Sequence, residues 1–190
     1  MMLMLRSFIG YHGTSSACKE KICKYGFNIK KYTFNKASLE QVPGDLGAGA
    51  YFYLDSIENA RKFAEKQIKE EDIAILKCEI VVAEENILDM DEEGNAEIFN
   101  ELRNNDKELK ALARRYKSNI GGKGRHNLDG VILESLIHKY NLDVHLVKKK
   151  TYTPFKGLPR NSNYFNGTEL CVKKKDIIKT MVSVDYKKEV

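Results

Sequence analysis

The sequence has no tryptophan, only three prolines and only four cysteines among its 190 residues. The cysteines form no CxxC pair and have no histidines at metal-ligand spacing, which argues against a zinc site or a disulfide framework and favours reduced, mostly buried thiols. No proline-rich or low-complexity tract marks a linker. Long apolar runs are also missing, since the apolar start at residues 1–5 ends at Arg6, too early for a signal peptide or a membrane span. We therefore expect a cytoplasmic protein with no metal site and no membrane association.

Length and charge predict one domain with an uneven charge distribution. At 42% hydrophobic and 31% charged residues, the chain is long enough for one well-buried core, so we expect a single domain over residues 1–190. The net charge is +5, and residues 139–190 carry twelve Lys or Arg against five Asp or Glu. A basic segment attracts polyanions such as nucleic acids. On charge alone, a solvated basic face is the simpler interpretation.

Hydrophobic spacing and capping residues predict the local structure. We expect a helix from Ser15 to Tyr25 that ends at Gly26 as its C-cap. A second helix is expected after Asp55 as N-cap, with Glu58 completing a capping box. Its apolar face would consist of Ile57, Ala60, Ala64 and Ile68, with Phe63 beside them. Strands are expected at residues 7–11, 50–54, 74–82, 129–133, 169–172 and about 177–185.

The middle of the chain is less regular. Residues 84–93 are acidic and predict a surface turn, and residues 98–116 predict one or two amphipathic helices. The glycine-rich basic stretch at residues 121–125 predicts a flexible loop, and it lacks the Lys-Ser/Thr ending of a phosphate loop. Strands scattered between helices, with few βαβ-length repeats, favour an α+β fold over a doubly wound sheet.

Three short stretches occur in an order that carries information. They are Tyr11-His12-Gly13-Thr14, Leu46-Gly47-Ala48-Gly49-Ala50-Tyr51-Phe52 and Gly167-Thr168-Glu169-Leu170-Cys171-Val172. Together they resemble the NAD-binding site of the ADP-ribosyltransferase superfamily, in its H-Y-E branch of diphtheria-like toxins and poly(ADP-ribose) polymerases. In that branch a first strand ends in His-Gly-Ser/Thr, a Gly-x-Gly-x-Tyr-Phe strand and a helix follow, and a late strand begins with the catalytic Glu. The resemblance covers both ends of the chain and leaves residues 72–165 unmatched.

The resemblance implies an α+β fold whose split antiparallel sheet forms an NAD cleft with flanking helices. It also implies roles for single residues: His12 would bind the adenosine-side ribose, and the backbone of Gly13 would hold the nicotinamide carboxamide, with Thr14 orienting that turn. Tyr51 would stack on the nicotinamide. Glu169 would bind a ribose hydroxyl and stabilise the positive charge that develops as the glycosidic bond breaks.

Two further residues belong to the expected NAD site. Strand alternation places Tyr53 on the same face as Tyr51, with Phe52 on the other. Relatives often supply a second stacking aromatic from the next helix, and Phe63 is the nearest candidate, although a core position explains it at least as well. One residue departs from the arginine-modifying pattern, which has Glu or Gln two positions before the catalytic Glu. This chain has Gly167 there, so arginine is not the expected acceptor.

Residues 150–166 lie where relatives place the segment that selects the target. This stretch mixes aromatics with cations and amides, which suits stacking on bases and contact with phosphates, and suits a protein surface nearly as well. The candidate target-binding residues are Tyr152, Phe155, Arg160 and Tyr164. Inward packing of the aromatics is the structural alternative.

The sequence therefore predicts an NAD-dependent mono-ADP-ribosyltransferase that acts on a macromolecule, as a toxin, effector or defence enzyme, without a metal. The basic C-terminal third favours a nucleic-acid target over a protein, and a toxin of this kind would also have a neutralising partner protein. Three alternatives stay open. They are an NAD glycohydrolase, a non-catalytic NAD or ADP-ribose binding module, and a tRNA 2′-phosphotransferase-like enzyme, which the single His-Gly-Thr motif fits poorly.

Overall fold

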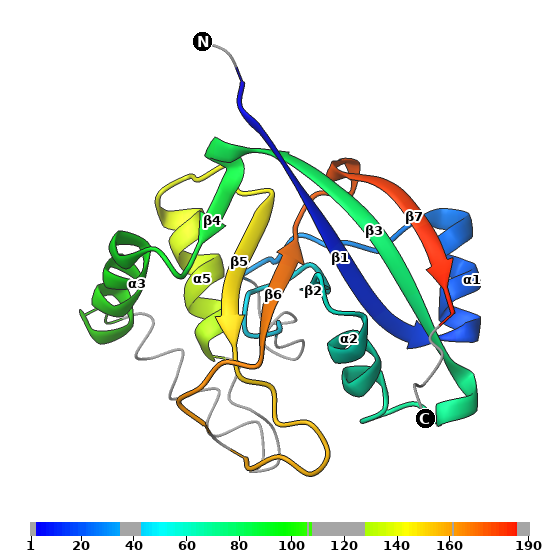
Figure 1. The fold of residues 1–190 in the computed structure, drawn as a ribbon. Coiled ribbons are helices and arrows are strands. Elements are labelled where there is room, and N and C mark those ends of the chain that lie inside the picture. The colour runs from blue at the N-terminus through cyan, green and yellow to red at the C-terminus, as the bar shows by residue number, and fades with distance from the viewer. Residues whose placement is uncertain (1–2, 35–42, 106, 108–127, 161, 186–190) are drawn as a thin grey trace.

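A computed structural model describes residues 3–34, 43–105, 107, 128–160 and 162–185. The predictions for residues 109–116 and for the basic loop at 121–125 lie outside these ranges. The described residues form an α+β fold in which four α-helices surround a seven-stranded sheet (Figure 1). The helices are α1 (Ser16–Tyr25), α2 (Ile57–Ala64), α3 (Glu93–Asn105) and α5 (Leu128–Lys139). The strands are β1 (Leu5–Ser15), β2 (Ala50–Leu54), β3 (Ile73–Ala83), β4 (Ile87–Asp89), β5 (Leu146–Thr151), β6 (Gly167–Val172) and β7 (Ile178–Val184).

The strand order is β4-β5-β6-β2-β1-β3-β7. Every neighbouring pair is antiparallel except β4 and β5, so the sheet is mixed. β1 and β3 pair along their whole length, from Leu5–Ala83 to Ser15–Ile73. By contrast, β1 and β2 pair at two positions only, Gly10–Leu54 and Tyr11–Tyr53. The sheet is therefore weakly joined at its centre, where the strands that carry two of the three motifs meet.

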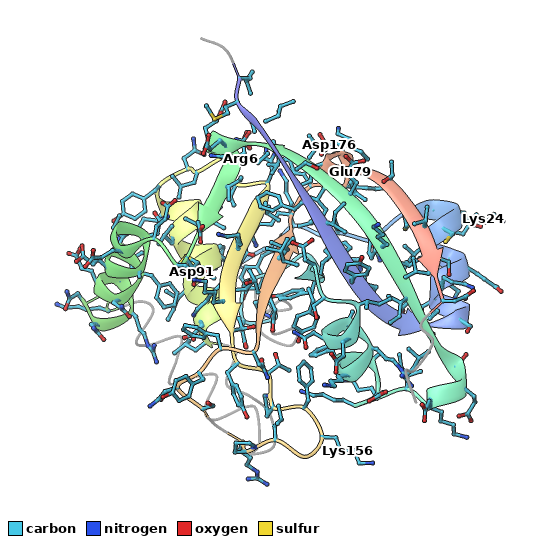
Figure 2. All side chains as sticks on the ribbon, in the orientation of Figure 1. Arg6, Lys24, Glu79, Asp91, Lys156 and Asp176 are labelled. Carbon is cyan, nitrogen blue, oxygen red and sulfur yellow. The ribbon has the colours of Figure 1, made fainter. Side chains whose placement is uncertain are left out.

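Apolar residues pack on both faces of the sheet. One core cluster contains Phe27, Phe52, Leu76, Ile80 and Leu170, and a second, beneath α3 and α5, contains Leu46, Leu88, Ile132, Val147 and Cys171. Phe52 and Leu170 belong to the first cluster, while Cys171 belongs to the second. A third, smaller cluster joins Tyr53, Ala60 and Phe155 and attaches α2 to the sheet. Figure 2 shows the side chains of the described residues on the ribbon.

Several sequence predictions are confirmed. Ser15 caps α1 by accepting a hydrogen bond from the Cys18 amide, and Gly26 ends the helix with a positive φ of 76° while its amide bonds to the Ile22 carbonyl. β2 and β6 include the predicted strands, and β7 lies within the predicted range 177–185.

Other local predictions are wrong, each for a physical reason. Residues 129–133 belong to helix α5, because a short run that is buried on all sides has no periodicity that separates helix from strand. Asp55 does not cap α2: it has a positive φ of 50°, and Ser56 is the N-cap, accepting from the Asn59 amide. The acidic region 84–93 contains β4, whose Leu88 is buried. Strand β5 was not predicted, because its three consecutive lysines hide the strand pattern.

The first strand is also longer than predicted. β1 runs to Ser15, so His12, Gly13 and Thr14 lie within a strand and Thr14 orients no turn. Pairing with β3 keeps this segment extended beyond Tyr11. The prediction of mostly buried thiols holds for two of the four cysteines. Cys78 and Cys171 are buried, while Cys18 and Cys23 are exposed.

Candidate active site

A small cleft, with a cavity volume of about 60 Å³, lies where β1 and β2 separate. It is lined by Tyr11, His12, Gly13, Tyr51, Phe52, Tyr53, Ala60, Phe63 and Glu169. The structure thus brings together residues from β1, β2, α2 and β6 that are up to 158 positions apart in the chain. All predicted catalytic residues and all predicted cofactor residues except Thr14 line this cleft.

Gly13 allows α2 to approach the sheet closely. A Cβ atom on Gly13 would lie 2.1 Å from the carbonyl oxygen of Ala60, which is a backbone atom and cannot rotate away. Any side chain here would push the helix outward, and with it Phe63. Thr14 next to it is buried and paired with Ala74 of β3. The motif therefore shapes the cleft wall through its backbone.

His12 closes the gap between the separating strands. Its Nδ1 atom lies 2.8 Å from the carbonyl oxygen of Tyr51, and because a carbonyl only accepts, Nδ1 carries the proton and donates it. The ring packs edge-on against Phe27 at 5.1 Å. Burial lowers the pKa of His12 below its ordinary value, against the opposing effect of the bond to Tyr51. A neutral ring with the proton on Nδ1 leaves Nε2 as a hydrogen-bond acceptor.

Tyr51 is fixed by the glycine-rich turn that precedes it. Its hydroxyl donates to the carbonyl oxygen of Gly47 at 2.6 Å and accepts from the Leu46 amide at 3.0 Å. Burial raises the pKa of Tyr51 above its ordinary range, so the phenol stays neutral. Gly47 has a φ of +88°, which side chains rarely adopt. The phenol thus points into the turn, and the ring is held as a wall of the cleft.

A buried ion pair supports the same turn. Lys173 Nζ lies 2.7 Å from Glu134 Oε1, and the two side chains are only 10% and 11% exposed. Glu134 also accepts from the Ala48 amide at 2.7 Å, while Lys173 donates to the carbonyl oxygens of Ala48 and Leu46 at 3.1 and 3.3 Å. Lys173 directly follows β6. This pair therefore ties the end of the Glu169 strand to the turn that holds Tyr51.

Glu169 lies between two strands that present side chains on its own face. Directly opposite residues of antiparallel strands share a face, and the register pairs Glu169 with Tyr53 of β2 and with Lys149 of β5. Tyr51 and Tyr53 share this face too, as strand alternation predicts. Two threonine hydroxyls, those of Thr151 and Thr153, donate to Glu169 Oε1 at 2.8 and 3.0 Å.

Two further rings border the cleft beside Glu169. Tyr53 is buried at 6% exposure, whereas Phe63 is 45% exposed, so the core interpretation of Phe63 is wrong. The centroids of these two rings lie 6.1 Å apart. α2 presents Phe63 at the mouth of the cleft because Ala60 and Ala64 take the buried positions.

A side chain at the position two residues before Glu169 would require the Asn59 side chain to move. A Cβ on Gly167 would lie 2.6 Å from Asn59 Nδ2, which donates to the Asn166 carbonyl oxygen at 2.8 Å. The Asn59 side chain of α2 therefore lies where a Cβ at position 167 would be.

The predicted target-binding residues divide into two groups. Phe155 is 5% exposed and packs 6.1 Å from Tyr53, so it belongs to the core and cannot contact a target directly. Tyr152 donates to the Pro159 carbonyl oxygen and is partly buried. Arg160 and Tyr164 are exposed, Tyr164 by 84%. Phe165, which the sequence analysis did not select, is 63% exposed beside it.

Cations surround this segment. Lys156 lies on its outer part and points away from the sheet (Figure 2). Lys66 lies 5.3 Å from the ring centroid of Phe63 and 5.5 Å from that of Phe155. Lys149 adds a further cation on the face of Glu169. Of these cations, Lys66 lies over Phe63, which lines the cleft.

Among the described residues, no group of three or more His, Cys, Asp or Glu side chains comes together as a metal site. Cys171 is fully buried, and burial raises the pKa of its thiol to about 11, which keeps it protonated.

The same part of the chain contains no helix with both the length and the apolar character that a membrane crossing needs.

Sequence reasoning missed the residues that support the site. Thr151, Thr153 and Asn166 belong to no recognised motif, and Glu134 and Lys173 are separated by 39 positions. The spacing of the threonines, 18 and 16 residues before Glu169, carries no periodic signal.

Comparison with protein-family models and with curated protein sequences finds no match to this chain.

Proposed function

We propose that this chain is an NAD-dependent mono-ADP-ribosyltransferase with an ADP-ribosyltransferase fold, acting as a single-domain toxin, effector or defence enzyme. The observation that carries the proposal is that His12, Tyr51 and Glu169, from three distant motifs, line one cleft. NAD supplies the ADP-ribosyl group: the bond between the nicotinamide nitrogen and the anomeric carbon breaks, its electron pair leaves with nicotinamide, and the target nucleophile bonds to that carbon and loses a proton.

The residues of the cleft fit such a substrate. Tyr51 and Phe63 offer aromatic faces for a flat pyridine ring. Nε2 of neutral His12 accepts a hydrogen bond from a ribose hydroxyl. The Glu169 carboxylate stabilises the positive charge that develops on the ribose and is placed to take the proton of the target nucleophile.

The surroundings of the cleft favour a nucleic-acid target over a protein. Exposed Tyr164 and Phe165 provide rings on which bases stack, and Lys156 and Arg160 provide charges for phosphates. The absence of a side chain at Gly167 speaks against arginine as the acceptor. A neutralising partner protein in the producing cell is part of the same proposal.

The test uses NAD labelled in its ADP-ribose part, incubated with the purified chain and a cell lysate, and E169Q as the background control. Label that resists protease and is released by nuclease supports transfer to nucleic acid, and the opposite result assigns a protein target. Transfer to nucleic acid should also fall steeply between about 50 and 200 mM salt, while nicotinamide release barely changes.

Two other outcomes identify the alternatives. Nicotinamide release without labelled macromolecule would identify an NAD glycohydrolase. Binding of NAD in calorimetry without any nicotinamide release would identify a non-catalytic module. Absence of NAD binding to the folded chain at millimolar concentration would contradict the proposal altogether.

A further inference from the structure

One oxygen of the Glu169 carboxylate is fully occupied by protein donors. Oε1 accepts from Thr151 Oγ1 at 2.8 Å and from Thr153 Oγ1 at 3.0 Å. Two hydroxyl donors satisfy the lone pairs of one carboxylate oxygen. Within the described part of the chain Oε2 has no such donor. The carboxylate is thus held by one oxygen, and Glu169 itself lines the cleft.

Thr153 is the buried centre of a directed chain of hydroxyls. It is completely buried, and its Oγ1 lies 3.0 Å from the hydroxyl oxygen of Tyr53. Thr153 has one hydroxyl hydrogen, and Glu169 accepts it, so Tyr53 is the donor in the contact between the two hydroxyls. The hydrogen bonds therefore run from Tyr53 through Thr153 to Glu169. Each donor polarises the next one toward the carboxylate.

The backbone of Thr153 is fixed by one asparagine. Asn166 accepts from the Thr153 amide through Oδ1 at 2.8 Å and donates to the Thr153 carbonyl oxygen through Nδ2 at 2.7 Å. Asn59 of α2 in turn holds the Asn166 carbonyl oxygen at 2.8 Å. Both ends of the segment from Thr153 to Asn166 are thereby joined to each other and to α2. These hydrogen bonds fix the position of the Thr153 backbone relative to α2.

We propose that Thr153 is the positioning residue for Glu169: its hydroxyl, oriented by Tyr53 and Asn166, holds the carboxylate so that Oε2 faces the ribose of the substrate. The role of the carboxylate rests on the proposed function, but the geometry does not. Thr153 gives up no proton in this role, because its hydroxyl hydrogen stays bonded to Thr153 throughout. It contributes by preventing rotation of the carboxylate before the glycosidic bond breaks.

T153V tests the proposal, because valine keeps the shape of threonine and removes only the hydroxyl. We expect kcat for nicotinamide release to fall by about 10- to 100-fold, as loss of a hydrogen bond to a charged group implies, with KM for NAD within about twofold. T153S, which restores the hydroxyl, should return kcat to within about threefold of the wild type. In the E169Q background T153V should have little further effect, since the carboxylate it positions is gone.

The matched control is T180V on β7. Thr180 also directs its hydroxyl at a glutamate, Glu79, at 3.4 Å, but on a strand remote from the cleft. T180V should leave kcat unchanged. Equal losses in T153V and T180V, wild-type kcat in T153V, or failure of T153S to recover activity would each overturn the proposal. If T153V does not fold, T151V and Y53F interrupt the same set of hydroxyls from its two sides.

Crystal structures of the wild type and T153V test the proposal independently of activity, by comparing the orientation of the Glu169 carboxylate. We expect the Glu169 carboxylate to leave its wild-type orientation in T153V. An unchanged carboxylate would overturn the proposal even if activity fell. A wild type that releases no nicotinamide, yet shows this rotation in T153V, would contradict the proposed function and leave the positioning role supported.

Discussion

Replacing Lys173 with methionine removes the cation of the buried ion pair and keeps most of the side-chain volume. In the described structure Glu134 would then keep one donor, the Ala48 amide at 2.7 Å, and its charge would have no counterion. The carbonyl oxygens of Leu46 and Ala48 would lose the same donor. The variant therefore leaves the buried carboxylate of Glu134 without a counterion beneath the turn that anchors Tyr51.

The expected cost is large because both partners are about nine-tenths buried. Breaking a buried pair by removing one partner costs about 3–5 kcal/mol. For a chain of this length, this cost lowers Tm by about 6–20 °C. Nicotinamide release should fall as well, since Gly47, whose carbonyl accepts the Tyr51 hydroxyl, belongs to the disturbed turn.

Urea unfolding monitored by circular dichroism measures this cost, and R6M is the matched control. Arg6 pairs with Glu84 at 2.5 Å, but these side chains are 53% and 45% exposed, so R6M should cost less than about 1 kcal/mol. The double variant E134L/K173M should be more stable than K173M, because no buried charge is left. Equal destabilisation by K173M and R6M would show that the Glu134–Lys173 pair contributes no more to stability than an exposed pair does.

Three further predictions concern the cleft and its surroundings. G13A should destabilise the fold by about 1–3 kcal/mol, because the new Cβ meets the Ala60 backbone. The control G94A should not destabilise the fold, because no atom lies near a Cβ at that position. Comparable unfolding midpoints of the two variants would contradict this prediction. Burial lowers the pKa of His12 in the folded state, so on acidification the unfolded chain takes up this proton at a higher pH than the folded chain does. The contribution of His12 to stability is therefore present above pH 6.5 and is lost as pH falls through the folded-state pKa. The unfolding free energies of wild type and H12N should therefore converge on acidification, and a constant difference would refute this. R160A/Y164A should abolish labelling of the target and keep nicotinamide release, and parallel loss of both would show that these exposed residues serve the fold.

Most residues of the candidate site were selected through the resemblance of three motifs to a known family, and local physics accounts for a smaller part. Strand alternation placed Tyr51 and Tyr53 on one face, and the register puts Glu169 on the same face. Gly47 was predictable as a turn residue, and its positive φ shows why glycine is needed there. Strand alternation and turn geometry depend on nearby residues only, whereas the register depends on the tertiary fold.

The supporting residues could not be predicted, because they depend on tertiary contacts. Thr153 meets Glu169 only after the segment between them has folded back on itself, and Lys173 meets Glu134 only after α5 packs under the sheet. The exposure of single side chains could not be predicted either. The sequence favoured Phe155 as a target-binding residue, but the ring is buried against Tyr53. Helix α5 was missed because burial on every side removes the amphipathic signal.

The most direct test of the account compares nicotinamide release from NAD by the wild type and E169Q, with E79Q as control. Glu79 is also a partly buried strand glutamate near a threonine hydroxyl, but it lies on β3, toward the far end of the sheet from Lys156 (Figure 2). We expect E169Q to keep the fold and most NAD affinity and to lose about 10²–10³-fold in rate, while E79Q matches the wild type. Release by E169Q within a few-fold of the wild type, or no release by the wild type itself, would contradict this expectation.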